Sequence, residues 1–153
     1  MTALPSRRAV AALGAVSAGL LLLSACNKPT PMATITVGTN SVSTQTDCYN
    51  DGKTVSTSKL AKCLASKDVK SITVDTDETV RFGVDPSIAD QGWMILLNNQ
   101  PITDSSNKTY RTIPGSVFFN PQYGASGNST LVSLKSGEKT VTGLWSFKLK
   151  KGS

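Results

Sequence analysis

Three cysteines and a complete lack of histidine determine which chemistry this 153-residue chain can perform. Without histidine the chain cannot build the Ser-His-Asp or Cys-His nucleophiles of hydrolases, and it lacks the commonest general base. Nearly all catalytic zinc sites and the His₂Cys copper site require histidine as well. We therefore expect no catalytic function, no metal centre and no cofactor.

The first cysteine lies at the end of an export-type leader. Arg7 and Arg8 precede an apolar run over residues 9–23, which is shorter than the about 20 residues that a permanent membrane helix needs. The segment Leu23-Ser24-Ala25-Cys26 then matches the lipobox of bacterial lipoproteins, with small residues before the cleavage point and a thiol that is acylated. We expect residues 1–25 to form a signal-peptide helix and Cys26 to carry the lipid. An ordinary signal peptide or an uncleaved anchor is the alternative.

The remaining two cysteines, Cys48 and Cys63, are then a pair in an extracytoplasmic chain, where paired cysteines are usually a disulfide. Closing a loop of this length stabilises the fold by about 3 kcal/mol in the chain-entropy model. A two-thiol metal or redox site is the competing interpretation, but the spacing is not Cys-x-x-Cys and no histidine could complete it. We predict a structural disulfide.

Two weaker motifs have simpler explanations. Ser56 and Lys59 have the Ser-x-x-Lys spacing of penicillin-recognising enzymes, but the partner motifs of those enzymes are missing. Asp75, Asp77 and Glu78 could contribute oxygens to calcium, which takes six to eight of them. Three acids in one short segment are more often a solvated turn, and we interpret them so.

The elements that would carry these residues are short strands separated by polar turns. Residues 26–153 amount to 128 residues, enough for one domain. Alternating apolar residues or a short apolar run predict strands at 34–37, 71–75, 79–84, 93–97, 131–135 and 141–150. This spacing indicates a mainly β protein, a single antiparallel β-sandwich over residues 34–153. We expect one short helix at 58–66 in the Cys48–Cys63 loop and a helical turn at 86–89. Residues 26–33, with two prolines, are expected to be a polar tether about 20 Å long.

Aromatic residues are the remaining candidates for a contact site. Trp93, Trp145 and Phe147 lie on strands at inward positions and are expected in the core. Phe118, Phe119 and Tyr123 fall in a stretch with proline and glycine that is typical of a loop, where exposed aromatics often mark recognition. They either plug the core or contact a partner. The sequence alone leaves both possibilities open.

The net charge of the chain argues against one class of partner, nucleic acid. Without Arg7 and Arg8, the 16 Lys and Arg residues become 14 against 10 Asp and Glu, so the net charge falls from +6 to +4. This mild, dispersed excess is unlike the clustered basic footprint of a nucleic-acid-binding protein. We expect no nucleic acid. The expected partners are the membrane, through the lipid on Cys26, and an envelope protein or a wall polymer.

The chain also resembles a known group of proteins. The lipobox, the Cys48–Cys63 pair, and segments 79–86, 89–93 and 143–147 are similar to small cell-envelope lipoproteins of actinobacterial type that carry a domain of unknown function. The resemblance implies an immunoglobulin- or cupredoxin-like sandwich on the outer face of the cell membrane. It implies no site residues. From all this we expect a lipid-anchored, non-catalytic accessory that binds a partner or supports the envelope. A small-ligand or metal carrier without histidine ligands is the alternative.

Overall fold

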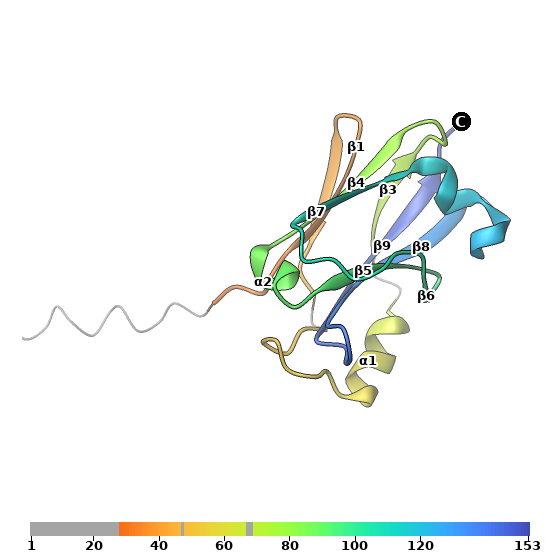
Figure 1. Ribbon diagram of the computed structural model, residues 1–153. Coiled ribbons are helices and arrows are strands. Elements are labelled where there is room, and N and C mark those ends of the chain that lie inside the picture. The colour runs from red at the N-terminus through yellow and green to blue at the C-terminus, as the bar shows by residue number, and fades with distance from the viewer. Residues whose placement is uncertain (1–27, 47, 67–68) are drawn as a thin grey trace, which may run out of the picture.

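A computed structural model describes residues 28–46, 48–66 and 69–153, which fold into a mainly β protein built from two facing sheets (Figure 1). Sheet A has the order β2 (Asn40–Thr44), β1 (Ala33–Val37), β4 (Thr79–Val84), β7 (Tyr110–Pro114). Sheet B has the order β3 (Lys70–Val74), β9 (Gly143–Lys151), β8 (Ser129–Ser136), β5 (Trp93–Leu97), β6 (Gln100–Pro101). The predicted β-sandwich is confirmed. The predicted signal segment 1–25 and Cys26 lie outside the described residues.

The pairing of the strands differs from the expected purely antiparallel pattern at one place. β3 pairs with β9 in parallel, with Ile72 opposite Leu149, whereas the other strand pairs are antiparallel. The antiparallel description is therefore wrong for this pair. A parallel pair needs a long crossover connection, and the chain between β3 and β9 supplies one by running through both sheets.

The core lies between the sheets because each strand alternates between buried and outward positions. In β4, Val80, Phe82 and Val84 are buried and their neighbours point outward, which is the period of two that the sequence shows. The largest fully buried side chains are Trp93, Trp145, Phe82, Phe118 and Phe147. The core placement predicted for Trp93, Trp145 and Phe147 is therefore confirmed.

Two short α-helices lie where the sequence predicts helical structure. α1 (Thr57–Leu64) begins after Ser56, whose hydroxyl accepts a hydrogen bond from the Lys59 backbone N–H, as a capping residue does. α2 (Pro86–Ala89) has proline in its first turn, where a missing N–H costs nothing. The stretch expected to be a loop around Phe118 contains two 3₁₀ helices, η1 (Gly115–Phe119) and η2 (Pro121–Tyr123). Among the described residues, no helix has the length and apolar character needed to cross a membrane.

The outer faces of the two sheets differ. On the outer face of sheet B, Leu60 and Cys63 of α1 pack against a small cluster of Cys48, Leu96 and Leu144. No such cluster lies on the outer face of sheet A in the part of the chain that the structure describes. The helix therefore covers the part of the outer face of sheet B around Leu96 and Leu144.

Candidate functional site

The segment that leads from the leader into the domain is fixed to the folded structure before β1 begins. Pro31 is buried, and its carbonyl accepts a hydrogen bond of 2.9 Å from Nε1 of Trp145. The next residue, Met32, makes two bonds to Asp85: its N–H donates to the carboxylate at 2.8 Å, and its carbonyl accepts from the Asp85 N–H at 3.1 Å. The chain thus docks on the end of the sandwich at Pro31.

Neighbouring residues hold the Trp145 ring in place for this contact. A side chain at Gly143 would collide with the ring, so glycine is needed there. The Tyr49 ring lies against the ring of Trp145, with their centroids 5.9 Å apart. The expected tether of 26–33 is therefore too long, because Pro31 and Met32 are bound to the domain and Ala33 belongs to β1.

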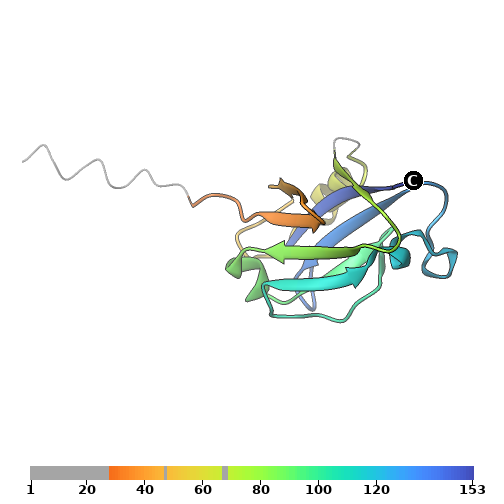
Figure 2. The ribbon, with the colours of Figure 1, turned by 90° about the horizontal axis from the view of Figure 1, so that it is seen from above.

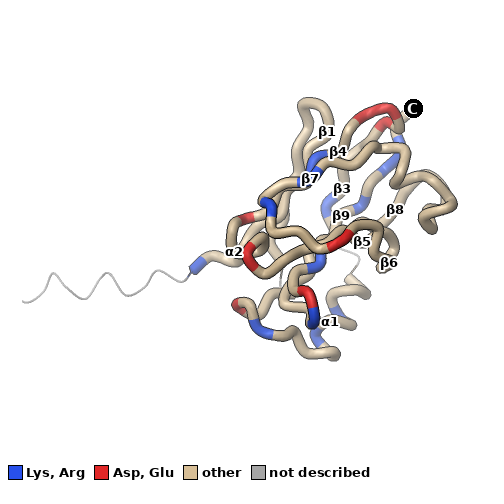
Figure 3. The backbone as a smooth tube through the Cα atoms, viewed as in Figure 1, with Lys and Arg blue, Asp and Glu red and all other residues tan. Residues whose placement is uncertain are grey.

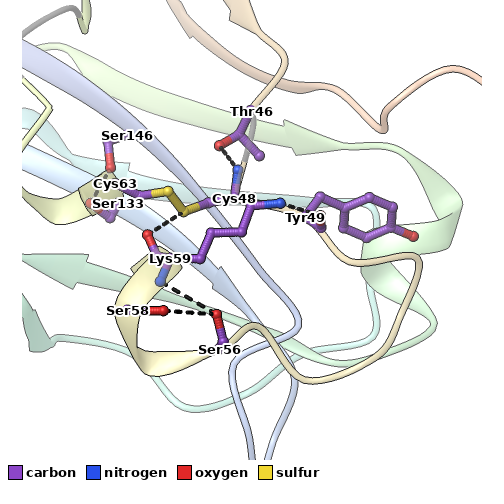
Figure 4. The surroundings of a disulfide bond; sticks show 9 residues. All are labelled: Thr46, Cys48, Tyr49, Ser56, Ser58, Lys59, Cys63, Ser133 and Ser146. Atoms are coloured by element: carbon purple, nitrogen blue, oxygen red, sulfur yellow. Dashed lines mark hydrogen bonds between the residues drawn. A yellow bond between two sulfur atoms is a disulfide. The ribbon is translucent and has the colours of Figure 1, made fainter. Parts of the chain in front are cut away.

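The predicted disulfide between Cys48 and Cys63 is present, with the two Cα atoms 6.2 Å apart (Figure 4). Cys48 is fully buried, and its N–H donates to the Thr46 hydroxyl at 3.0 Å. Cys63 lies in α1, so the bond ties this helix to the outer face of sheet B. With both sulfurs in this bond, the pair is structural, and neither residue is free as a thiolate ligand.

Ser56 and Lys59 do not form a nucleophile–base pair. The Ser56 hydroxyl caps α1, whereas Nζ of Lys59 donates to the Tyr49 carbonyl at 3.4 Å (Figure 4). The Ser-x-x-Lys spacing is thus explained by the capping of a helix, whose first turn brings residues i and i+3 together.

Beside the disulfide lies an open cleft of about 440 Å³. It is formed by the segment after β2, one side of α1 and the outer face of β9. Its described lining consists mainly of polar residues, with two lysines and the disulfide-bonded Cys63: Thr44, Gln45, Thr46, Lys59, Lys62, Cys63, Ser66, Val69, Leu144 and Ser146. The volume is within the range of small-molecule sites. Asp47, Lys67 and Asp68 are adjacent in the chain and lie outside the described residues.

The acidic residues form a turn between β3 and β4. The Asp75 N–H donates to the Glu78 carboxylate at 3.3 Å, and the Glu78 N–H donates back to the Asp75 carbonyl at 3.1 Å. Across the described residues, no three His, Cys, Asp or Glu side chains come together as metal ligands would. The geometry is that of a hydrogen-bonded turn, as the sequence indicates.

The structure separates the three aromatic residues of the predicted contact loop. Phe118 is fully buried, and its ring packs against Phe82 with centroids 5.7 Å apart. A contact role for Phe118 is therefore wrong, because a ring in the core cannot reach a partner. Phe119 is half-buried against the core, and Tyr123 is 47% exposed. The excursion that carries them lies at the opposite end of the sandwich from Pro31 (Figures 1 and 2).

The sequence did not predict three features: the docking of Pro31, the cleft beside the disulfide, and the serine and threonine side chains on the outer face of sheet A. The first two depend on contacts between distant segments and have no local signal. The outer face of sheet A has a local signal, the alternating hydroxyl residues at 34, 36, 41 and 43.

Comparison of the chain with protein-family models, curated proteins and solved structures finds no match.

Proposed function

We propose that this protein is a lipid-anchored, non-catalytic domain on the extracytoplasmic face of the cell membrane, where it binds or supports a component of the envelope. The leader with Arg7 and Arg8, the lipobox ending at Cys26 and the resemblance to small actinobacterial lipoproteins support this location. The Cys48–Cys63 disulfide supports it as well, because such bonds persist in oxidising compartments and are rare in the cytosol.

The docking of Pro31 is the observation that carries the proposal. Pro31 lies five positions after Cys26, with four residues between them, and a fully extended chain over five positions spans at most about 18 Å. A lipid on Cys26 would therefore hold one defined end of the sandwich, the end that contains Trp145 and Asp85, close to the bilayer. A domain meant to act far from the membrane would need a longer free segment, so the short reach favours a role at the membrane surface.

The test is metabolic labelling with a fatty acid. Wild-type protein should incorporate the label and remain in the membrane fraction, whereas Cys26→Ser should incorporate none and remain as precursor or appear in the soluble fraction. Cys48→Ser is the matched control, because it also removes one thiol but leaves the lipobox intact, and it should be labelled like the wild type. Label on the Cys26→Ser protein would contradict the proposal.

The cleft beside α1 favours one alternative, a carrier of a small ligand. A carrier is stabilised by its ligand in proportion to RT ln(1 + [L]/Kd), so its melting temperature should rise with ligand concentration. Sugars, amino acids and dicarboxylates are suitable probes. Filling the cleft with Ser146→Trp should remove the rise. An unchanged melting temperature with every probe favours the accessory over the carrier.

A further inference from the structure

The outer face of sheet A is rich in hydroxyl groups. In the part of the chain that the structure describes, no helix or loop covers this face (Figure 2). Six of its outward positions are serine or threonine, and we call this surface the hydroxyl face: Thr34, Thr36, Ser41, Ser43, Thr79 and Thr112. No charged residue occurs between Lys28 and Asp47, so the β1–β2 hairpin is neutral (Figure 3).

Hydrogen bonds between strands hold part of this array in position. The hydroxyls of Thr34 and Ser43 lie 2.7 Å apart, and those of Thr36 and Ser41 lie 3.1 Å apart. Each hydroxyl has one donor and two acceptor positions, so the Thr34–Ser43 pair keeps one donor and several acceptor positions for a ligand. Ser41 also donates to the Ile35 carbonyl at 3.4 Å, so its pair with Thr36 offers acceptor positions. The result is an array that can both donate and accept hydrogen bonds without burying a charge.

A glycine interrupts the array at a position where neither the backbone conformation nor the packing of the protein requires glycine. Gly83 lies inside β4, between its register partners Thr34 and Tyr110. Its φ is not positive, and a Cβ added there would meet nothing within 4 Å. Glycine weakens a strand, and inside one it often marks a close approach by a ligand or another backbone. The open space above Gly83 therefore suggests contact with something outside the chain.

An exposed aromatic ring stands beside this space. Tyr110 pairs with Gly83 across the β4–β7 ladder and is 66% exposed, more than any other large hydrophobic residue described. Directly opposed residues in antiparallel strands have Cβ positions about 5 Å apart. Arg81, the next outward residue of β4, is also exposed. The aromatic ring of Tyr110, the open space at Gly83 and the set of hydroxyls thus lie together on one face.

We propose that the hydroxyl face binds a linear polysaccharide strand. A sugar ring would lie over Gly83 with its C–H groups against the Tyr110 ring, and its hydroxyls would bond to the threonine and serine hydroxyls. Arg81 would donate to a carbonyl or carboxylate substituent of the sugar. This inference names a partner for the domain proposed above and rests on that proposal for the presence of a wall polymer within reach of the membrane.

The chemistry of the face argues against the two other classes of partner. Protein interfaces have an apolar core rich in aromatic side chains, whereas this face offers Tyr110 and Pro114 in a setting of hydroxyls. Binding to an anionic lipid surface needs several basic residues, and Arg81 is the one cation among the outward positions of the described sheet A strands. A hydroxyl-bearing polysaccharide with few acidic substituents matches the face better than either.

The test uses a chain beginning at Lys28, because every strand and all buried core residues of the described structure lie between Pro31 and Lys151. Its binding to protein-free peptidoglycan and to chitin is measured by co-sedimentation, and its affinity for chitohexaose by titration. Tyr110→Ala should weaken binding about tenfold. Gly83→Val should abolish binding while the melting temperature stays equal or rises, because valine fits a strand better than glycine.

The controls are substitutions of the same kind elsewhere. Tyr123→Ala removes an exposed tyrosine from the opposite end of the sandwich, and Ser71→Val adds a branched side chain to β3 of sheet B; both should bind normally. Equal binding by all four variants, or no binding by the wild type, overturns the proposal. Binding to phosphatidylglycerol vesicles but not to polysaccharide also overturns it and identifies a lipid contact instead. The chain used here lacks Cys26, so a failure of lipidation and a failure of polysaccharide binding are separate outcomes.

Discussion

Replacing Trp145 with phenylalanine should release the segment that connects the leader to the domain. The ring of Trp145 is fully buried, and its Nε1 donates to the Pro31 carbonyl at 2.9 Å. The substitution leaves that buried carbonyl without a partner, which costs about 1–3 kcal/mol. The smaller ring loses further packing worth on the order of 1 kcal/mol. We expect the free energy of unfolding to fall by about 2–4 kcal/mol in a urea titration.

Hydrogen exchange at the Met32 amide separates the specific effect from general destabilisation. This N–H donates to Asp85, and it should exchange about ten to a hundred times faster once Pro31 is released. Trp93→Phe is the matched control, because Trp93 is equally buried and its Nε1 donates to the Lys108 carbonyl at 2.7 Å. It should lose similar packing, lose less from the broken hydrogen bond because Lys108 is exposed, and leave Met32 protected. Unchanged exchange at Met32 in Trp145→Phe would show that other contacts dock the segment.

Two further predictions concern the disulfide and the aromatic residues. Replacing Cys48 and Cys63 together with serine should lower the free energy of unfolding by about 2–4 kcal/mol, measured by urea denaturation without reductant; an unchanged midpoint would mean that the bond adds no stability. Phe118→Ala should cost about 3–5 kcal/mol because it empties a core position beside Phe82, whereas Tyr123→Ala should change stability by less than about 0.5 kcal/mol. Comparable losses in these two variants would refute the separation of the loop into core and surface residues.

The parts of the fold that the sequence predicts are those with a strong local pattern. Alternation in β4 and the apolar run of β5 mark both strands with their observed bounds, 79–84 and 93–97, and Pro86 marks the start of α2. β2 and β7 were not predicted, because an edge strand buries little and its sequence is mostly polar. Their one strongly apolar residue each, Val42 and Ile113, gives no alternation to detect.

The features of the fold that could not be predicted from the sequence depend on contacts between segments that are far apart in the chain. The parallel pairing of β3 with β9 joins segments from distant parts of the chain, and nothing within either strand specifies its partner. The docking of Pro31 on Trp145 spans 114 residues in the same way. Phe118 is core even though proline and glycine surround it, because a loop that folds back over a sandwich can fill the space between the sheets.

The position of β9 has a consequence for when the domain can fold. β9 is the last strand in chain order, yet it lies inside sheet B, bonded to β3 on one side and β8 on the other, and it carries Trp145, Phe147 and Leu149 into the core. Until this strand arrives, β3 has no partner in its sheet and the core cannot close. Such long-range pairing makes folding slow. For the lipid-anchored location proposed above, the chain would have to cross the membrane, and a chain that crosses it unfolded would stay unfolded until β9 has emerged on the far side.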